Sequence, residues 1–233
     1  MNAQGPHRDV EFRVPVAHWS AWPPLAAQGS EPAAQPDVHF VEPLLRRRLS
    51  RLATMTLHVA HACTQGVPRL RLVFASRHGE LKRAMVMLRE LARSAPLSPT
   101  AFSLSVHNTA AGILSIVRQD RSPTTAIAAG DETLGFGLLE AFCEFAADPA
   151  LPVLMVYGDE PLPDEYRGFA ERPERPHAVA ILLAGGAGRD ITLTMTAGGA
   201  APSPESQSFA FLQCLSEGIP GTWHGSQHTW TWH

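Results

Sequence analysis

A strand that breaks sharply into a helix is the feature that most constrains this sequence. The apolar run Thr125 to Ala129 ends at Gly130 and Asp131, and a helical pattern then extends from Leu134 to Ala147. Such an elbow presents a nucleophile above the sheet in many α/β enzymes, at the helix end where the dipole favours an anion. Here the elbow carries the carboxylate of Asp131. The simpler interpretation is that Asp131 caps the helix, accepting hydrogen bonds from its first turn.

The segments around the elbow predict an α/β fold. Apolar runs indicate strands over 69–76 and 153–157, and residues 44–64 and 80–93 show helical spacing. In the helix 80–93, the side chains expected to face the core are Leu81, Met85, Leu88 and Leu91. Strands alternating with helices favour a layered, largely parallel sheet with helices on both faces.

The two ends of the chain look less regular. Residues 1–40 are rich in Pro, Ala and Gln and predict an extended arm with a short strand over 11–16. Two β-rich runs, 177–183 and 190–196, flank the glycine-rich segment 184–189 and predict a hairpin. That segment lacks the Lys-Ser/Thr ending and the helix of a phosphate-binding loop. Residues 198–233 are expected to form a tail with a short helix over 209–215, and the whole chain 1–233 a single domain.

Composition argues against several classes of partner. A net charge of -3 and one basic run, Arg46 to Arg48, give no reason to expect nucleic acid. The longest charge-free apolar run, 178–188, is too short to span a membrane, and no signal segment precedes it, so we expect a cytoplasmic protein. The three cysteines, Cys63, Cys143 and Cys214, lie among apolar residues without a CxxC pair, which favours buried thiols in a reducing compartment.

Two clusters of reactive residue types need an explanation. His58, His61 and Cys63 lie close together in one predicted helix, but no second ligand pair follows, so we expect neither a metal nor another cofactor. Ser105, His107 and Asp131 are the residue types of a hydrolytic triad. Ser105 and His107 are only two residues apart, so their side chains diverge on a helix. A small hydrolase or acyltransferase is therefore the alternative, and His107 and Asn108 are expected instead to hydrogen-bond neighbouring backbone.

Several segments together resemble a known family. They are LVFASRHGEL (72–81), PLSPTAFSLSVHNTAAGILSI (96–116), TTAIAAGDETLGFGLLEA (124–141), VLMVYGDE (153–160) and AVAILL (178–183). They resemble the thiolase-like condensing enzymes, and most closely the short β-ketoacyl synthase-like proteins that accompany aryl polyene pigment pathways. The resemblance implies an α/β fold that is half of a thiolase-like fold, a layered mixed β-sheet with helices on both faces.

The resemblance also bears on activity. Full-length ketosynthases carry a nucleophilic cysteine at the elbow, which corresponds here to Asp131, and two histidines in a second half that this sequence does not continue into. No catalytic role is carried over to His224, His228 or His233. The family therefore implies a catalytically silent homologue, because a carboxylate accepts an acyl group from a thioester poorly.

A partner is the remaining implication. Subunits of the family pair through the strand of the elbow, so the residues expected at the interface are Thr125, Ala126, Ile127, Ala128 and Ala129. Without a nucleophile, the expected dimer is with a catalytic β-ketoacyl synthase, in a role like that of a chain length factor. His107, Asn108 and Phe136 are then candidates for lining an acyl tunnel. Arg46 to Arg48 could contact an acidic acyl carrier protein, although a solvated helix face is the simpler interpretation.

Overall fold

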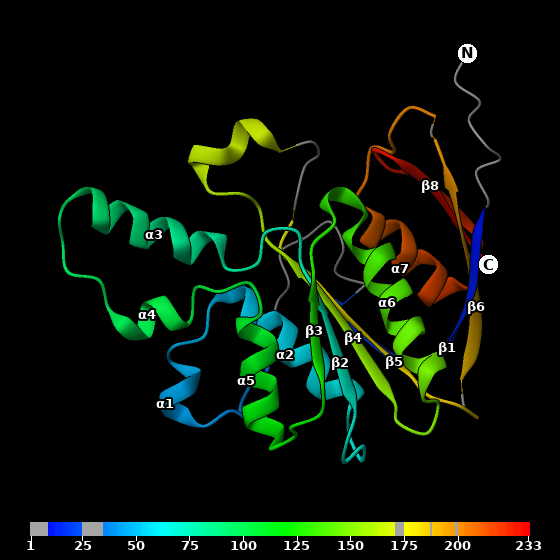
Figure 1. Cartoon of the computed structure of the whole chain (residues 1–233), viewed down its shortest axis with the longest axis horizontal. Helices are drawn as coiled ribbons and strands as arrows, with labels where there is room; N and C mark the ends of the chain where they lie inside the picture. The colour runs from blue at the N-terminus through cyan, green and yellow to red at the C-terminus, as the bar shows by residue number, and fades with distance from the viewer. Residues whose placement is uncertain (1–8, 25–34, 171–174, 187, 199) are drawn as a thin grey trace.

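The fold is built on one eight-stranded mixed sheet with the strand order β3-β2-β4-β5-β1-β6-β8-β7 (Figure 1). The computed structural model describes residues 9–24, 35–170, 175–186, 188–198 and 200–233. The strands are β1 (Val10–Trp22), β2 (Arg71–Ala75), β3 (Thr124–Ile127), β4 (Val153–Asp159), β5 (His177–Leu183), β6 (Arg189–Ala197), β7 (Gly221–His224) and β8 (His228–Trp232).

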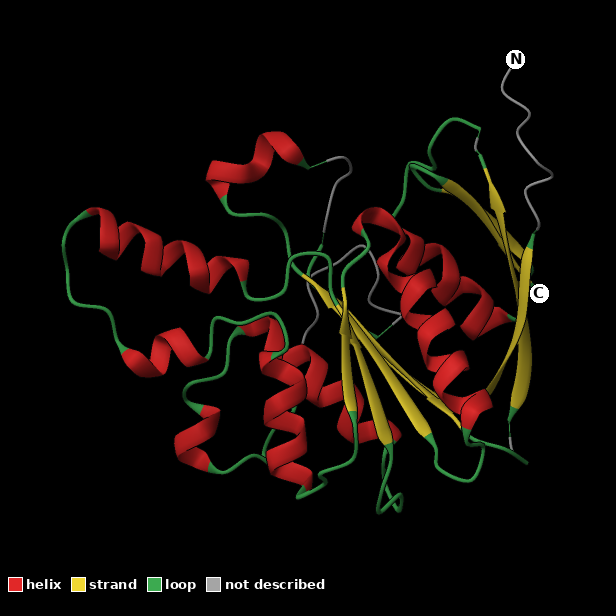
Figure 2. Ribbon diagram, in the orientation of Figure 1, coloured by secondary structure: helices red, strands yellow, loops and turns green. Residues whose placement is uncertain are grey.

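Helices cover both faces of this sheet (Figure 2). They are α1 (Pro43–Arg46), α2 (Arg51–Cys63), α3 (Leu81–Ala92), α4 (Pro99–Ser103), α5 (Thr109–Arg118), α6 (Thr133–Ala147) and α7 (Gln207–Glu217). Alternation along β2 explains the layers: Leu72 and Phe74 pack with α2 and α5, whereas Val73 and Ala75 pack with α6 and α7. The α/β class, the mixed sheet and the helices on both faces are thus confirmed.

The prediction of a largely parallel sheet is wrong. Only β2 with β3 and β2 with β4 pair in parallel, and every other pairing of the described strands is antiparallel. The predicted hairpin is also wrong, because β5 and β6 both pair with β1, which lies between them. The glycine-rich segment 184–189 therefore connects two strands that do not pair with each other.

Both chain ends contribute to the sheet more than predicted. The segment expected as an extended arm contains β1, whose Phe12, Val14 and Val16 are buried in the core; residues 1–8 and 25–34 of that arm lie outside the described residues. The expected tail contains α7 and also the β7–β8 hairpin. Trp223, Trp230 and Trp232 of that hairpin are among the most deeply buried side chains.

Two predictions about burial are wrong as well. Leu88 and Leu91 of α3 are 51% and 59% exposed, although Met85 of the same helix is buried. Cys143 is exposed, whereas Cys63 and Cys214 are buried as expected. Within the described part of the chain, no helix is both long and apolar enough to cross a bilayer.

Candidate functional site

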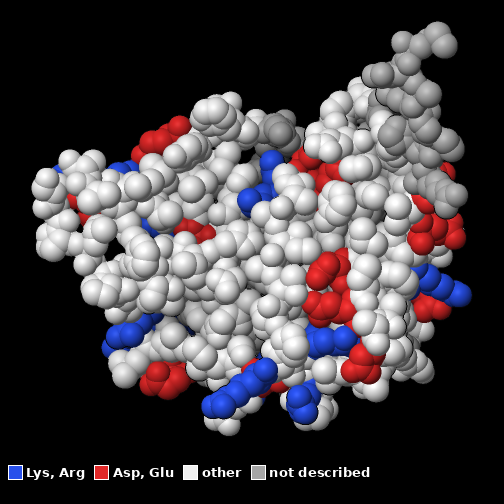
Figure 3. All heavy atoms as spheres, in the orientation of Figure 1, with Lys and Arg blue, Asp and Glu red and all other residues white. Residues whose placement is uncertain are grey.

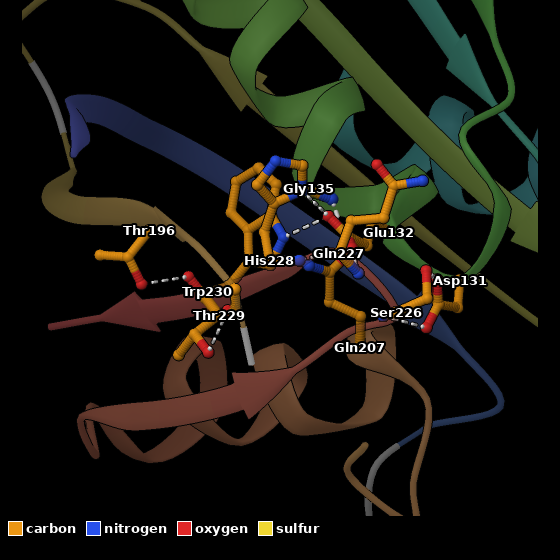
Figure 4. Close-up of polar contacts among 11 residues, drawn as sticks. Asp131, Glu132, Gly135, Thr196, Gln207, Ser226, Gln227, His228, Thr229 and Trp230 are labelled. Carbon is orange, nitrogen blue, oxygen red and sulfur yellow. Dashed lines mark hydrogen bonds and ion pairs between the residues drawn. The ribbon is translucent and has the colours of Figure 1, made fainter. Parts of the chain in front are cut away.

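The elbow after β3 is built by a short turn that hands the chain to α6. Gly130 has a φ of +57°, a backbone conformation that favours glycine, and begins the 3-10 turn Gly130–Glu132. The hydroxyl of Thr133 accepts from the amide of Ala129 at 2.9 Å and donates to the carbonyl of Gly130 at 2.7 Å. The side chains of Asp131 and Glu132 are thereby held under the C-terminal hairpin (Figure 4).

Asp131 does not cap α6, contrary to the sequence prediction. Glu132 occupies the N-cap position, and no side-chain cap bond is formed there. The Asp131 carboxylate instead accepts from the backbone amide of Ser226 at 3.1 Å and from its hydroxyl at 2.8 Å. Asp131 is 8% exposed, so the turn between β7 and β8 covers the elbow carboxylate.

Glu132 is the main attachment of the C-terminal hairpin. Its Oε1 accepts from the backbone amides of Gln227 and His228 at 2.9 and 3.0 Å. Its Oε2 accepts from Nδ1 of His228 at 2.7 Å and from Nε1 of Trp230 at 3.0 Å. Since Glu132 is 2% exposed, these donors replace the water that a carboxylate needs. From the sequence, Glu132 is expected only to add to the favourable interaction with the helix dipole, and no local pattern signals its bonds to the C-terminal hairpin.

Phe136 lies one helical turn after Glu132 and packs on the same hairpin. Its ring is edge-on to the rings of His228 and Trp230, with centroids 5.7 and 5.4 Å apart. The β7–β8 hairpin therefore covers at least one side of Phe136, which is a candidate for lining the acyl tunnel. His228 takes part in this contact and in the hydrogen bond to Glu132, so it has a structural role at the elbow.

A second polar network lies at the carboxyl ends of β2 and β4. The buried Asp159 carboxylate accepts from Ser76 Oγ at 2.9 Å, from the amide of Arg77 at 3.0 Å and from the Tyr157 hydroxyl at 2.6 Å. Burial, reinforced by the charge of Asp159, raises the pKa of Tyr157 well above its usual value. This hydroxyl is therefore a hydrogen-bond donor to Asp159 within β4, and the bonds from Ser76 and Arg77 to the same carboxylate connect the end of β2 to β4.

A Ser–His contact adjoins this network. Nε2 of His177 lies 2.6 Å from Oγ of Ser208, and Nδ1 lies 2.7 Å from the carbonyl oxygen of Arg175. A neutral imidazole donates from Nδ1 to that carbonyl and accepts from Ser208, as in a catalytic dyad. Both residues are buried, however, and the contact joins β5 to the first turn of α7 away from solvent. No sequence pattern signals this pair, because 31 positions separate the two residues.

The hypothetical triad is not assembled. Ser105 Oγ donates to the carbonyl of Phe102 at 2.8 Å, and Nε2 of His107 donates to the carbonyl of Ser76 at 2.8 Å. Neither side chain is thus oriented toward the other or toward Asp131. The bond from His107 confirms that this residue ties its segment to neighbouring backbone, whereas Asn108 precedes α5 without a side-chain cap bond.

The two buried thiols and the histidine cluster have structural surroundings. Burial raises the pKa of the Cys63 thiol to about 12 and also raises that of Cys214, which disfavours the thiolate. His58 contacts the backbone of Asp37, and His61 stacks on Phe40. Among the described residues, no group of three or more His, Cys, Asp or Glu is placed to hold a metal ion.

The predicted interface segment lies at the edge of the sheet. β3 pairs with β2 only, and no described strand covers its other side. Ala126 and Ala128 are exposed, and Thr125, Ile127 and Ala129 are partly exposed. The backbone amides of Leu72 and Ser76 donate to the carbonyls of Pro123 and Ile127. Because the backbone groups of successive residues in a strand point to opposite sides, those of Thr124 and Ala126 point away from β2.

Arginines line an open groove on another part of the surface. Arg47 and Arg48 lie with Arg83, Ser98 and Thr100 around a volume of about 550 Å³. Arg83 donates to the carbonyl of Arg48 at 2.9 Å and so fixes the loop between α1 and α2 to α3. Three arginines thus line the groove, whereas Arg46 is not among its lining residues.

Comparison with known proteins identifies the family. The family model of the β-ketoacyl synthase N-terminal domain matches residues 19–233. The chain belongs to this family. A search of the curated proteins gave no match.

Solved structures extend the relationship. The chain is similar to one in the structure of the ketosynthase ApeO in complex with its chain length factor ApeC from Xenorhabdus doucetiae. The identity is 28%, the TM-score 0.77, and the alignment covers 95% of this chain and 99% of that one. The ishigamide ketosynthase/chain length factor aligns over 81% of this chain and 68% of that one, with 14% identity and a TM-score of 0.59.

A β-ketoacyl synthase from Burkholderia phymatum shares the fold at 12% identity and a TM-score of 0.58, over 77% of this chain and 55% of that one. The expected thiolase-like architecture, with its mixed sheet between helices, is therefore confirmed.

Proposed function

We propose that this protein is a non-catalytic, chain-length-factor-like subunit that binds the catalytic subunit of a β-ketoacyl-[acyl carrier protein] synthase. In this role it stabilises the active subunit and helps to shape its acyl tunnel. The pathway we propose is fatty-acid-like aryl polyene biosynthesis. The observation that carries the proposal is the match to a chain of a ketosynthase–chain length factor complex over nearly the full length of both chains.

The chemistry of the elbow supports a silent subunit. We assign Asp131 to the position that the nucleophilic cysteine occupies in ketosynthases. Its carboxylate already accepts two hydrogen bonds from Ser226 and is nearly buried. A carboxylate in this state is a weak nucleophile toward a thioester, and the anhydride that it would form hydrolyses.

The edge of the sheet supports a partner. Thr125 to Ala129 form a mainly apolar edge whose outer side no described strand covers, and natural proteins cover such edges to avoid uncontrolled strand pairing. We propose that the ketosynthase pairs with this strand. His107, Asn108 and Phe136 remain candidates for contact with the acyl chain, and the groove beside Arg47 and Arg48 remains a candidate for an acidic carrier protein.

The alternative of a small hydrolase or acyltransferase has little support. Ser105 and His107 bond to separate backbone carbonyls, and the Ser208–His177 pair is buried. Neither arrangement offers a substrate an accessible serine with an adjacent base.

Co-expression with a β-ketoacyl synthase from the same genome tests the proposal. Size-exclusion chromatography with light scattering should give a one-to-one complex, and the ketosynthase should be less soluble when it is expressed alone. Two independent peaks would contradict the proposed function.

A further inference from the structure

The helix α3 is attached to the rest of the chain without a hydrophobic core. Neither of the two core clusters that the described residues form includes a side chain of α3. Only Met85 and Met87 of this helix are buried. Its main neighbour among the described elements is α4, which has no buried residue, whereas α2, α5 and α6 pack on strands of the sheet. Apolar burial therefore contributes less to holding α3 in place than it does for those helices.

Open space separates α3 from the segment that follows β4. A groove of about 430 Å³ lies between α3 and the 3-10 turn η3 (Asp164–Phe169), and its lining includes Met85, Val86 and Leu162. A smaller cavity of about 120 Å³ lies at the N-terminal end of α3, with Lys82 and Glu160 in its wall. The helix and this segment are thus adjacent without close packing of their side chains.

Ion pairs bridge this gap. Nζ of Lys82 lies 2.5 Å from Oε2 of Glu160, and Nε of Arg89 donates to Oε1 of Glu165 in η3 at 2.8 Å. Figure 3 shows acidic and basic side chains side by side at the upper left, where η3 lies above α3 in Figure 1. The side chains of Lys82 and Arg89 are 48% and 46% exposed. Dissolved salt can therefore screen both pairs.

The first turn of α3 has a further attachment. Nη2 of Arg83 donates to the carbonyl of Arg48 at 2.9 Å, and Nε of Arg83 lies 3.4 Å from Oε2 of the buried Glu80. This attachment joins the start of the helix to the loop before α2. Arg89 lies almost two turns further along, so its pair with Glu165 holds the distal half of the helix.

The chain that carries α3 leaves and rejoins the rest of the protein at one place. Gly79 precedes the helix with a φ of +52°, and a Cβ added there would lie 2.8 Å from Cδ2 of His107. These two residues are therefore in contact, and they bound the excursion 80–106. Ser94, just after the helix, also has a positive φ, of +55°. The helix lies between two turns that set its direction relative to the sheet.

From this geometry we infer that α3 is a salt-sensitive flap. It pivots about its first turn and is latched over the groove by the ion pair of Arg89 with Glu165. Opening widens the groove and exposes Met85 beside the segment that follows β4. Since the latch is electrostatic and partly exposed, ionic strength sets the population of the open state. Latching is a property of the isolated chain and does not rest on the proposed function.

Hydrogen exchange of the purified full chain, followed by mass spectrometry, tests the flap. An increase from about 0.01 M to about 1 M KCl shortens the Debye length from about 30 Å to about 3 Å. Peptides from residues 83–92 should then exchange at least about threefold faster, as expected for loss of an exposed ion pair. Peptides from α2 report the effect of salt on exchange chemistry itself and should change by less than about 1.5-fold.

A charge swap tests the latch. At low salt, R89E and E165R should each accelerate exchange in residues 83–92 by about threefold or more, because each places like charges together. The double variant R89E/E165R restores opposite charges and should return exchange to the wild-type rate. The matched control is R121E, which makes the same charge change at an exposed residue before β3 and should leave exchange in α3 unchanged.

A distance measurement distinguishes movement of the helix from its melting in place. Spin labels at A92C and F169C lie on exposed residues of α3 and η3, in a C143S background because Cys143 is exposed. Electron–electron double resonance should show a population at longer distance that increases with salt. Broadening without such a population would overturn the flap in favour of local melting. Salt-independent exchange of α3, equal acceleration of α2, or failure of R89E/E165R to restore slow exchange would overturn it as well.

Discussion

Nδ1 of His228 lies 2.7 Å from Oε2 of Glu132, a contact between residues 96 positions apart. It closes the C-terminal hairpin over the elbow at the start of α6. The same oxygen accepts from the indole of Trp230, so the buried side chain of Glu132 connects the elbow to β8. The stability of β7 and β8 is therefore linked to the elbow at the start of α6.

Replacement of Glu132 should destabilise the whole fold. In E132Q the amide nitrogen must face either the paired donors of Gln227 and His228 or those of His228 and Trp230, which leaves buried N–H groups without acceptors. We expect a loss of about 2–4 kcal/mol in the free energy of unfolding, measured by urea denaturation. The control E217Q changes an exposed carboxylate and should shift stability by less than about 0.5 kcal/mol. Equal stability of E132Q and the wild type would contradict this role.

Local sequence patterns predicted several helices and strands, but not how the strands pair. The elements β2, α3, α6 and β4 were found close to their observed bounds because periodicity and turn residues are local signals. The predicted helix 44–64 is wrong at its start, because the chain forms two helices there, α1 (Pro43–Arg46) and α2 (Arg51–Cys63). The position of β1 between β5 and β6 was not found, since strand pairing across the chain leaves no local trace. The hairpin prediction from the glycine-rich segment failed for the same reason.

The C-terminal hairpin did carry a signal. In HTWTWH, the buried Trp230 and Trp232 alternate with partly exposed threonines, which is the period of a half-buried strand. The partner of that strand and its attachment to Glu132 could not be inferred, because the donors and the carboxylate meet only after the sheet has formed.

Gly135 should tolerate no side chain. A Cβ at this position would lie 2.8 Å from Cζ2 of Trp230 and 2.8 Å from Nε2 of Gln207, both in buried residues. We expect G135A to lose about 1–3 kcal/mol of stability through overpacking. G112A in α5 is the matched control, because a Cβ at Gly112 would have nothing within 4 Å, and it should be neutral or stabilising by up to about 1 kcal/mol. Thermal melts of both variants measure the difference, and equal melting temperatures would argue against the close packing of α6 on β8.

Glu80 should make stability depend on pH. Burial raises the pKa of this carboxyl above its ordinary value of 4.5, against the opposing effects of Ser50 and Arg83. A raised pKa in the folded state means that the protonated form contributes stability fully below about pH 4.5, and that this contribution is lost as the pH rises through the folded pKa. E80Q cannot ionise, so its stability relative to the wild type should increase with pH over this window. Urea denaturation between about pH 4 and 8 measures the trend, and a constant difference would refute it.

A cysteine at the elbow should not create an enzyme. In D131C the isolated chain gains a thiol, but that thiol lies under the turn of the C-terminal hairpin, where Ser226 now bonds to Asp131. We expect D131C to condense an acyl thioester with a malonyl thioester no faster than D131S does. Mass spectrometry of the carrier-bound products measures this activity. Activity of D131C in the absence of a ketosynthase would contradict the expectation that this chain corresponds to half of a ketosynthase and lacks the histidines that act on the malonyl donor.

The backbone of β3 offers a selective test of strand pairing. The amide of Ala126 points away from β2, as the bonds to Pro123 and Ile127 indicate. A126P removes this outward donor and should leave the pairing with β2 intact, since proline is tolerated at the free side of an edge strand. We expect its Kd for the ketosynthase to rise by about tenfold or more with little change in melting temperature, because each lost pairing also disturbs its neighbours across the edge. A126S keeps the donor and should bind as the wild type does; equal binding by A126P would exclude β3 pairing as the basis of the complex.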